Sequence, residues 1–215
     1  MIETTKNALA KVPEGNYVDK PLPKPEFTNA TFFSEERKLP TNYIMGSFVG
    51  APAGTEEYAA SLVLETMLGE RLFEEVRTKR NLSYAPGTGC DASETATICD
   101  IYVTAVDPNK TLPVMIDELK KAQAMPLSDD DLAAAKAKTR TEMLMSTETT
   151  DGQAGALGRA FLLTGDWRNH NKVLDQIANV KASDLQAYAK KHFGKLQVVL
   201  LGNPKQLDEK LATSF

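Results

Sequence analysis

Residues 70–84 read ERLFEEVRTKRNLSY, and the interpretation of the whole chain starts from them. Leu72, Phe73 and Val76 recur at helical spacing and give the segment one apolar face, so we expect a short helix packed on a core. The pattern has no strong stop signal before Asn81, and the residues that follow it are typical of extended chain. The stretch therefore predicts a helix that leads into a strand.

Two side chains of this stretch are candidates for chemistry. Arg77 is expected in the last helical turn and Tyr84 on the adjoining strand, so that both point at one concave surface. A planar guanidinium and a phenolic donor together suit recognition of a carbonyl, a carboxylate or a developing oxyanion. The spacing alone leaves a structural interpretation open, since Arg77 can simply be solvated or contact the helix carbonyls, and Tyr84 can be half-buried core.

Three groups of residues in the stretch carry a family resemblance: 71–73 (RLF), 76–80 (VRTKR) and 82–84 (LSY). They resemble the R-L-F-x-x-V-R-x-K-x-x-L-x-Y signature in the C-terminal half-domains of the pitrilysin/insulinase family of zinc metallopeptidases. Mitochondrial processing peptidase and the core subunits of the respiratory bc1 complex are similar. The resemblance covers roughly residues 27–205 in the same order of elements. One departure is local: Leu68-Gly69-Glu70 stands where the family commonly has a Gly-Gly-x-x-Ser-Ser-type loop.

The resemblance implies a fold and a role. Members of the family build a clamshell from two or more α+β domains, one of which carries zinc while another closes over the peptide. By analogy, Arg77 would orient the substrate backbone, and Tyr84 would donate a hydrogen bond to the scissile carbonyl or its oxyanion. The implied partners are a zinc-bearing half-domain, in cis or in trans, and an unfolded peptide substrate. Alone, the chain should be inert.

Two other functions stay open beside this accessory role in a zinc endopeptidase. A non-catalytic scaffold or peptide-binding subunit of the same fold is allowed by the similarity to the respiratory core subunits. An unrelated α+β binding domain that carries the motif by chance is the third.

The zinc-binding chemistry of such peptidases is not predicted in this chain. It needs two histidines four apart on a helix, a glutamate between them as general base, and a further glutamate ligand. The only histidines are His170 and His192, and neither has a histidine or cysteine at ligand spacing. We therefore expect no metal or cofactor site here and zinc in a partner domain. No Gly-x-Ser-x-Gly or cysteine–histidine arrangement indicates another hydrolase.

Composition limits the classes of function. The 215 residues are 42% hydrophobic, and the net charge of −4 gives no broad attraction for nucleic acid or anionic membranes. No apolar run is long enough for a transmembrane helix, and the N-terminus lacks the apolar core of a signal peptide. The chain is expected to be either cytoplasmic or a piece of a larger protein, and the resemblance favours a piece.

The order of elements predicts an α+β fold with a mixed, largely antiparallel sheet covered by helices. Residues 12–26 contain four prolines, so residues 1–26 are interpreted as an N-terminal segment and linker, and residues 27–215 as the domain. Strands are expected at 28–37, 42–49, 84–92, 97–106 and 196–201, and helices at 55–68, 111–124, 150–163, 183–192 and after a cap at Ser128.

The two cysteines lie in one predicted hairpin. If Glu94-Thr95 is its tip, Cys90 and Cys99 are directly opposite each other. Both a cross-strand disulfide and two half-buried free thiols remain open. A bridge would indicate an oxidising compartment such as the periplasm, whereas free thiols would fit the cytoplasm.

The expected helix at 150–163 is rich in glycine. Gly152, Gly155 and Gly158 are interpreted as positions of close helix packing, because no preceding strand or Gly-Lys-Ser/Thr ending supports a phosphate-binding loop. Trp167, just after this helix, is interpreted as a packing anchor.

Overall fold

A mixed sheet with strand order β1-β5-β2-β4-β3 organises the protein, seen in a computed structural model that describes residues 2–16, 18, 20, 23–93, 95–124 and 127–215. Among the strand pairs of the described residues, only β1–β5 is parallel, which confirms the predicted mixed, largely antiparallel sheet. The last strand, β5, lies between the first two, so β1 and β2 are not neighbours although they are consecutive in sequence. The strands are β1 (Thr31–Glu36), β2 (Asn42–Gly50), β3 (Gly87–Ala92), β4 (Thr97–Ala105) and β5 (Gln197–Gly202).

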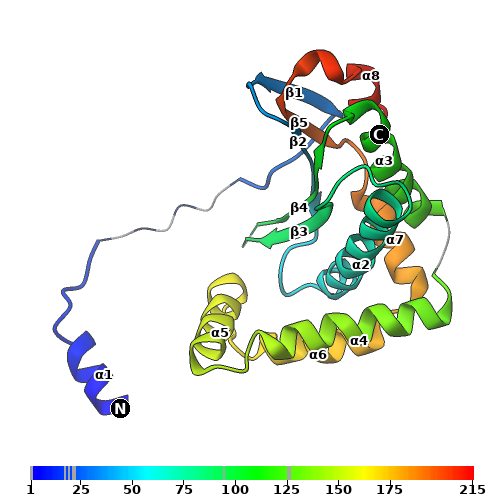
Figure 1. The fold of residues 1–215 in the computed structure, drawn as a ribbon. Coiled ribbons are helices and arrows are strands. Elements are labelled where there is room, and N and C mark those ends of the chain that lie inside the picture. Colours follow the sequence, from blue (N-terminus) through cyan, green and yellow to red (C-terminus); the bar gives the residue numbers. More distant parts are fainter. Residues whose placement is uncertain (1, 17, 19, 21–22, 94, 125–126) are drawn as a thin grey trace.

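One face of the sheet is buried and the other is open. In β2, Ile44 and Phe48 point into the core, while Tyr43 and Met45 on the opposite face are about two-fifths exposed. This alternation follows from the two-residue period of a strand whose sheet is covered on one side. Helices cover the buried face (Figure 1).

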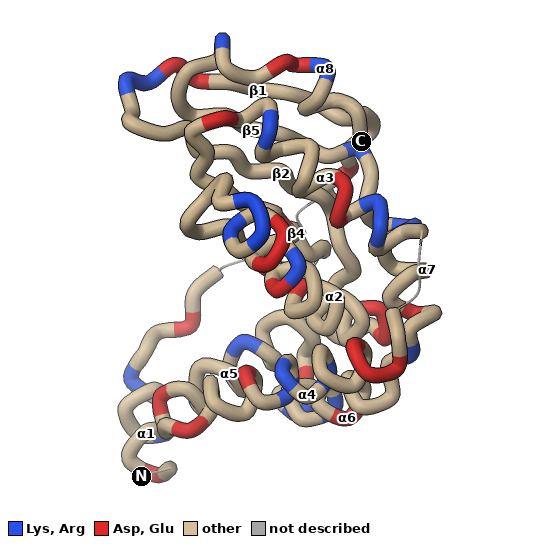
Figure 2. The backbone as a smooth tube through the Cα atoms, turned by 45° about the vertical axis from the view of Figure 1, so that its right-hand side comes forward, with Lys and Arg blue, Asp and Glu red and all other residues tan. Residues whose placement is uncertain are grey.

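Helix α2 is the centre of the helical layer and packs against α3, α4, α6, α7 and strand β3. Helices α4, α5 and α6 gather at the end of the molecule away from β1 and β5 (Figures 1 and 2). No helix in the described ranges has the length and apolar character needed to cross a bilayer. The helices are α1 (Ile2–Leu9), α2 (Glu56–Leu72), α3 (Pro108–Ala124), α4 (Asp129–Met145), α5 (Thr150–Thr164), α6 (Asn169–Asn179), α7 (Ala182–His192) and α8 (Glu209–Ala212), with a π-helical turn η1 (Phe73–Thr78) and a 3₁₀ turn η2 (Pro204–Gln206).

The short helix predicted within residues 70–84, before Asn81, is not a separate element. Helix α2 runs through Gly69 and continues directly into η1, so there is no loop between Leu68 and Glu70. A Cβ atom on Gly69 would lie 3.1 Å from the Thr88 side-chain oxygen of β3. Gly69 therefore lets the helix approach the sheet closely, and the absence of a family-type loop leaves one long helix.

Of three local expectations, one is confirmed and two are wrong. Ser128 caps α4 by accepting a hydrogen bond from the Asp131 backbone N–H at 3.2 Å, as predicted. Trp167 is not a packing anchor, because 44% of it is exposed and the Arg168 guanidinium lies over its ring. Among the α5 glycines only Gly152 makes a close approach, since a Cβ atom on Gly155 or Gly158 would meet no atom within 4 Å.

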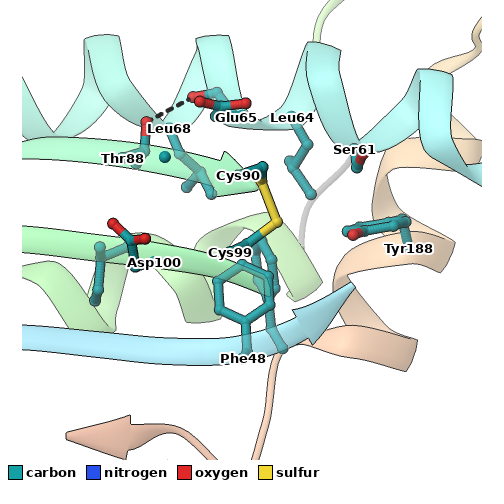
Figure 3. A pocket seen from close by; sticks show the side chains of 13 residues that line it. Phe48, Ser61, Leu64, Glu65, Leu68, Thr88, Cys90, Cys99, Asp100 and Tyr188 are labelled. Carbon is teal, nitrogen blue, oxygen red and sulfur yellow. Dashed lines mark hydrogen bonds between the residues drawn. A yellow bond between two sulfur atoms is a disulfide. The ribbon is translucent and has the colours of Figure 1, made fainter. Parts of the chain in front are cut away.

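The β3–β4 hairpin carries a disulfide between Cys90 and Cys99, which face each other in the strand register. Their Cα atoms are 4.1 Å apart, as in a non-hydrogen-bonded antiparallel pair. The bridge lies beneath α2, between the helix and β2 (Figure 3). Of the expected hairpin tip, Glu94 lies outside the described residues.

Reduction of this bridge should destabilise the domain. Cross-linking residues nine apart removes entropy from the unfolded chain, a contribution of about 2–3 kcal/mol to the free energy of unfolding. Chemical denaturation with and without dithiothreitol measures the difference, and thiol titration of the denatured, unreduced protein should find no free thiol. Two reactive thiols before reduction, or an unchanged denaturation midpoint after it, would contradict the bridge.

Candidate substrate-binding site

The end of the α2–η1 helix is fixed by burial and by one tight turn. Val76 is fully buried, and its carbonyl accepts a hydrogen bond from the Leu82 backbone N–H at 2.9 Å. Asn81 adopts a φ of 50°, in the left-handed region that asparagine tolerates better than most residues. The chain therefore reverses immediately after the helix and passes back beside Arg77, whose carbonyl accepts from the Asn81 N–H.

Tyr84 lies before strand β3 and not on it, which corrects the predicted strand start. Pro86 has no backbone N–H to donate to a ladder, so pairing begins only at Gly87. Ser83 anchors the preceding bend, because it is buried and its hydroxyl lies 3.3 Å from both the Thr104 hydroxyl and the Ala85 backbone N–H. With Ser83 turned inward, Tyr84 is 77% exposed and cannot be half-buried core.

The structure brings the two predicted site residues into contact. The Arg77 guanidinium carbon lies 4.1 Å from the centre of the Tyr84 ring and 4.8 Å from the centre of the Phe73 ring. Both contacts are cation–π interactions, which favour a guanidinium over an aromatic face. Phe73 is a site residue that the sequence reasoning treated only as core, although its position four residues before Arg77 on a helix signals such a contact.

Lys79 and Arg80 are neutralised by a carboxylate, and Arg77 is not. Lys79 donates to the Glu75 carboxylate at 2.6 Å, and Arg80 pairs with the same carboxylate. These hydrogen bonds, from Lys79 first and then Arg80, lower the pKa of Glu75 to about 2. Within the described part of the chain, no carboxylate or other acceptor pairs with the Arg77 guanidinium. Its N–H donors are therefore left for an external acceptor.

Sequence comparison assigns a family to this arrangement. The profile described as "Peptidase M16 inactive domain" matches residues 1–139, well over half of the chain. The chain belongs to the peptidase M16 family. This confirms the resemblance to zinc metallopeptidases that the R-L-F…V-R…L-x-Y residues carry.

Relatives of this M16 domain are longer proteins. An uncharacterized zinc protease of Rickettsia felis is 24% identical over 175 residues, which cover 78% of the chain and 42% of that protein. A protease from Helicobacter pylori has the same fold, with a TM-score of 0.83 at 17% identity over 94% of this chain and 51% of its own. The crystal structure of a peptidase M16 inactive domain from Pseudomonas fluorescens gives a TM-score of 0.80 at 20% identity. The match covers 93% of this chain and 50% of that one. The chain thus spans about two-fifths of that curated relative.

The histidines of this M16 domain do not fit a zinc site. His192 ends α7, where its Nδ1 lies 2.9 Å from the Val49 carbonyl and its ring packs on Tyr188. His170 lies in the first turn of α6, on another helix. In the described ranges, no group of three or more His, Cys, Asp or Glu side chains is arranged to hold a metal ion. Among the described residues, the donor set therefore does not fit the zinc ion of the family.

A half-buried carboxyl on α2 was not singled out by the sequence. Glu65 lines the space between α2, β3 and α4, and the Thr88 hydroxyl donates to its backbone carbonyl at 3.2 Å (Figure 3). Burial, and then the nearby Asp100 and Glu142 carboxylates, raise the pKa of Glu65 to about 7. The raised pKa of Glu65 could not be predicted from the sequence, because the neighbouring Asp100 and Glu142 carboxylates come from other elements.

Glu65 should make the stability of this M16 domain fall with rising pH. Its pKa rises from 4.5 to about 7 on folding, so between these values the native state keeps a proton that the unfolded chain releases. Glu65→Gln should flatten this dependence and stabilise the protein above about pH 7, by on the order of 2 kcal/mol. Midpoints of chemical denaturation, measured for both proteins from pH 4.5 to above pH 7, test this pH dependence. Glu74→Gln, on the exposed face of η1, is the matched control, and equal pH profiles for wild type and Glu65→Gln would rule the effect out.

Proposed function

We propose that the chain is the accessory, substrate-positioning domain of a zinc-dependent endopeptidase and is inert without a zinc-bearing partner domain. The observation that carries the proposal is the exposed stack of Phe73, Arg77 and Tyr84, in which Arg77 has no partner among the described acceptors. Membership of a family described as an inactive peptidase domain supports a role beside the catalytic centre and not as that centre.

The two polar groups of the stack have different tasks in this proposal. The aromatic rings hold the Arg77 guanidinium by its face, so its N–H groups at the edge can donate to backbone carbonyls of an extended peptide. The Tyr84 hydroxyl donates to the scissile carbonyl as negative charge develops on its oxygen. Closure of the partner domain over the stack excludes water, which strengthens both hydrogen bonds.

Substitution of either residue should lower turnover without unfolding the domain. The chain is mixed with its zinc-bearing partner, and cleavage of an unstructured peptide is measured for wild type, Arg77→Ala and Tyr84→Phe. Each variant should lose about a hundredfold in turnover, the scale of a lost oxyanion donor. Arg77→Lys should also be impaired, because an ammonium group cannot reproduce the planar donor fork.

Arg80→Ala provides the matched control. It removes a cation three residues away that is already paired with Glu75, so turnover should stay close to wild type. If cleavage never occurs with any partner, or if Arg77→Ala and Tyr84→Phe behave as Arg80→Ala does, the proposal is wrong. A non-catalytic scaffold or peptide-binding subunit would then be the better account.

A further inference from the structure

A cavity of about 390 Å³, open to solvent, lies beneath α5 and is bordered by α2, α4, α5, α6 and the loop that precedes α2. Its wall is mainly apolar, with a few polar groups at one side, which is the usual character of a ligand-binding cavity. The larger apolar side chains that line it are Tyr58, Leu62, Met143, Leu163 and Val173.

Small residues keep this cavity open on the α5 side. Gly155 and Ala156 line it, and a Cβ atom on Gly155 would meet no other atom within 4 Å. No residue of α5 is buried, so this helix roofs the space without filling it. Because the space opens to solvent, an apolar ligand group that enters it would displace water from the Leu62, Met143 and Val173 side chains, which is favourable.

One further contact holds the roof in place. Arg159 of α5 donates to the Asp91 carboxylate at 2.6 Å and to the Ala92 carbonyl at 3.0 Å, both at the end of the edge strand β3. The helix is thereby tied to the sheet from one side of the cavity. The space is consequently formed before any ligand arrives, which lowers the entropic cost of binding.

Clefts that share lining residues lead from the cavity to Phe73, the first residue of the Phe73–Arg77–Tyr84 stack. A cleft beside Phe73 shares Gly69, Glu70 and Lys138 with a second cleft between α2 and α4. That second cleft shares Leu62, Met143 and Ser146 with the cavity beneath α5. We call this succession the α2 groove: it begins at Phe73, follows α2 and ends beneath α5.

We propose that the α2 groove binds an extended segment of the substrate peptide and that the cavity beneath α5 receives one bulky apolar side chain of it. This inference rests on the proposed function, because the segment is the one whose other end Arg77 and Tyr84 hold. The middle of the groove is polar, with the Glu70–Lys138 ion pair and the Thr66–Thr139 hydrogen bond, and so suits a peptide backbone. The apolar end supplies the preference for one side chain.

The length of the groove sets the position of that side chain. Leu62 precedes Phe73 by eleven residues on one nearly continuous helix, which corresponds to ~16 Å along the axis. An extended peptide covers this distance in about five residues. The apolar residue should therefore lie about five positions from the part of the peptide that contacts the stack.

The test uses the full chain and the neutral probe N-phenyl-1-naphthylamine, which fluoresces in apolar surroundings. Wild type should bind the probe, and Gly155→Leu should weaken its binding about tenfold or more, because the new side chain fills the cavity. Gly158→Leu is the matched control: it makes the same change on the same helix, also into open space, at a residue that does not line the cavity. It should leave probe binding unchanged.

Peptides then identify the occupant. A flexible peptide of about twelve residues with a single phenylalanine should displace the probe at about tenfold lower concentration than the same peptide with serine at that position. Moving the phenylalanine should give one best position. Gly155→Leu should abolish the preference, and Gly158→Leu should keep it. The inference is overturned if Gly155→Leu binds the probe as wild type does, or if no peptide displaces the probe.

A third variant tests the proposed function separately from the cavity site. Arg77→Ala should weaken binding of every peptide while keeping the phenylalanine preference, because the cavity is intact. If Arg77→Ala leaves peptide affinity unchanged and Gly155→Leu still abolishes the preference, the cavity site stands and the role of the stack fails. If Arg77→Ala weakens peptide binding but Gly155→Leu keeps the phenylalanine preference, the cavity site fails and the role of the stack stands.

Discussion

Burial of Leu72 and Val76 at the end of the long helix is the constraint on which the candidate site depends. Both side chains are fully buried, and the turn that carries them packs against α3. Burying each contributes about 1.5–3 kcal/mol, so the rotation of this last turn about the helix axis is strongly fixed. Arg77 follows Val76 directly and is therefore turned toward Phe73 and Tyr84 and away from the core.

Among the described residues, the end of the same helix carries both paired and unpaired cations. Glu75 lies within reach of Lys79 and Arg80 and holds both, and its low pKa keeps it ionised throughout the ordinary pH range. Arg77 points to another side and meets aromatic rings in place of a carboxylate. Glu75 thus neutralises Lys79 and Arg80, while Arg77 keeps unengaged donors on a guanidinium that is stacked on aromatic rings.

Periodicity, caps and turn residues predicted the order of strands and helices well, because those signals are local. Sequence reasoning failed where a distant residue decides the outcome. The helix expected at 55–68 stops before Gly69, whereas α2 continues through Gly69 and packs closely there against Thr88 of β3. The sequence predicted that Arg77 and Tyr84 point at one surface, whereas their direct contact was not predicted and the exposure of Tyr84 depends on the buried Ser83. Gly155 and Gly158 could not be assigned to open space from sequence, since helix packing and cavity lining use the same small residues.

The insertion of β5 between β1 and β2 has a consequence for the order of assembly. Phe33 pairs with Val199, and Met45 pairs with the same residue from the other side, so two early strands are joined through a strand that is synthesised after the other four. Contacts between residues so far apart in sequence form slowly, because a long loop must be closed first. On a ribosome, β2, α2, β3 and β4 can associate early, while β1 must wait until residue 202 has emerged (Figure 1). The half of the sheet next to the Arg77–Tyr84 stack is therefore complete before the half that joins the two ends of the fold.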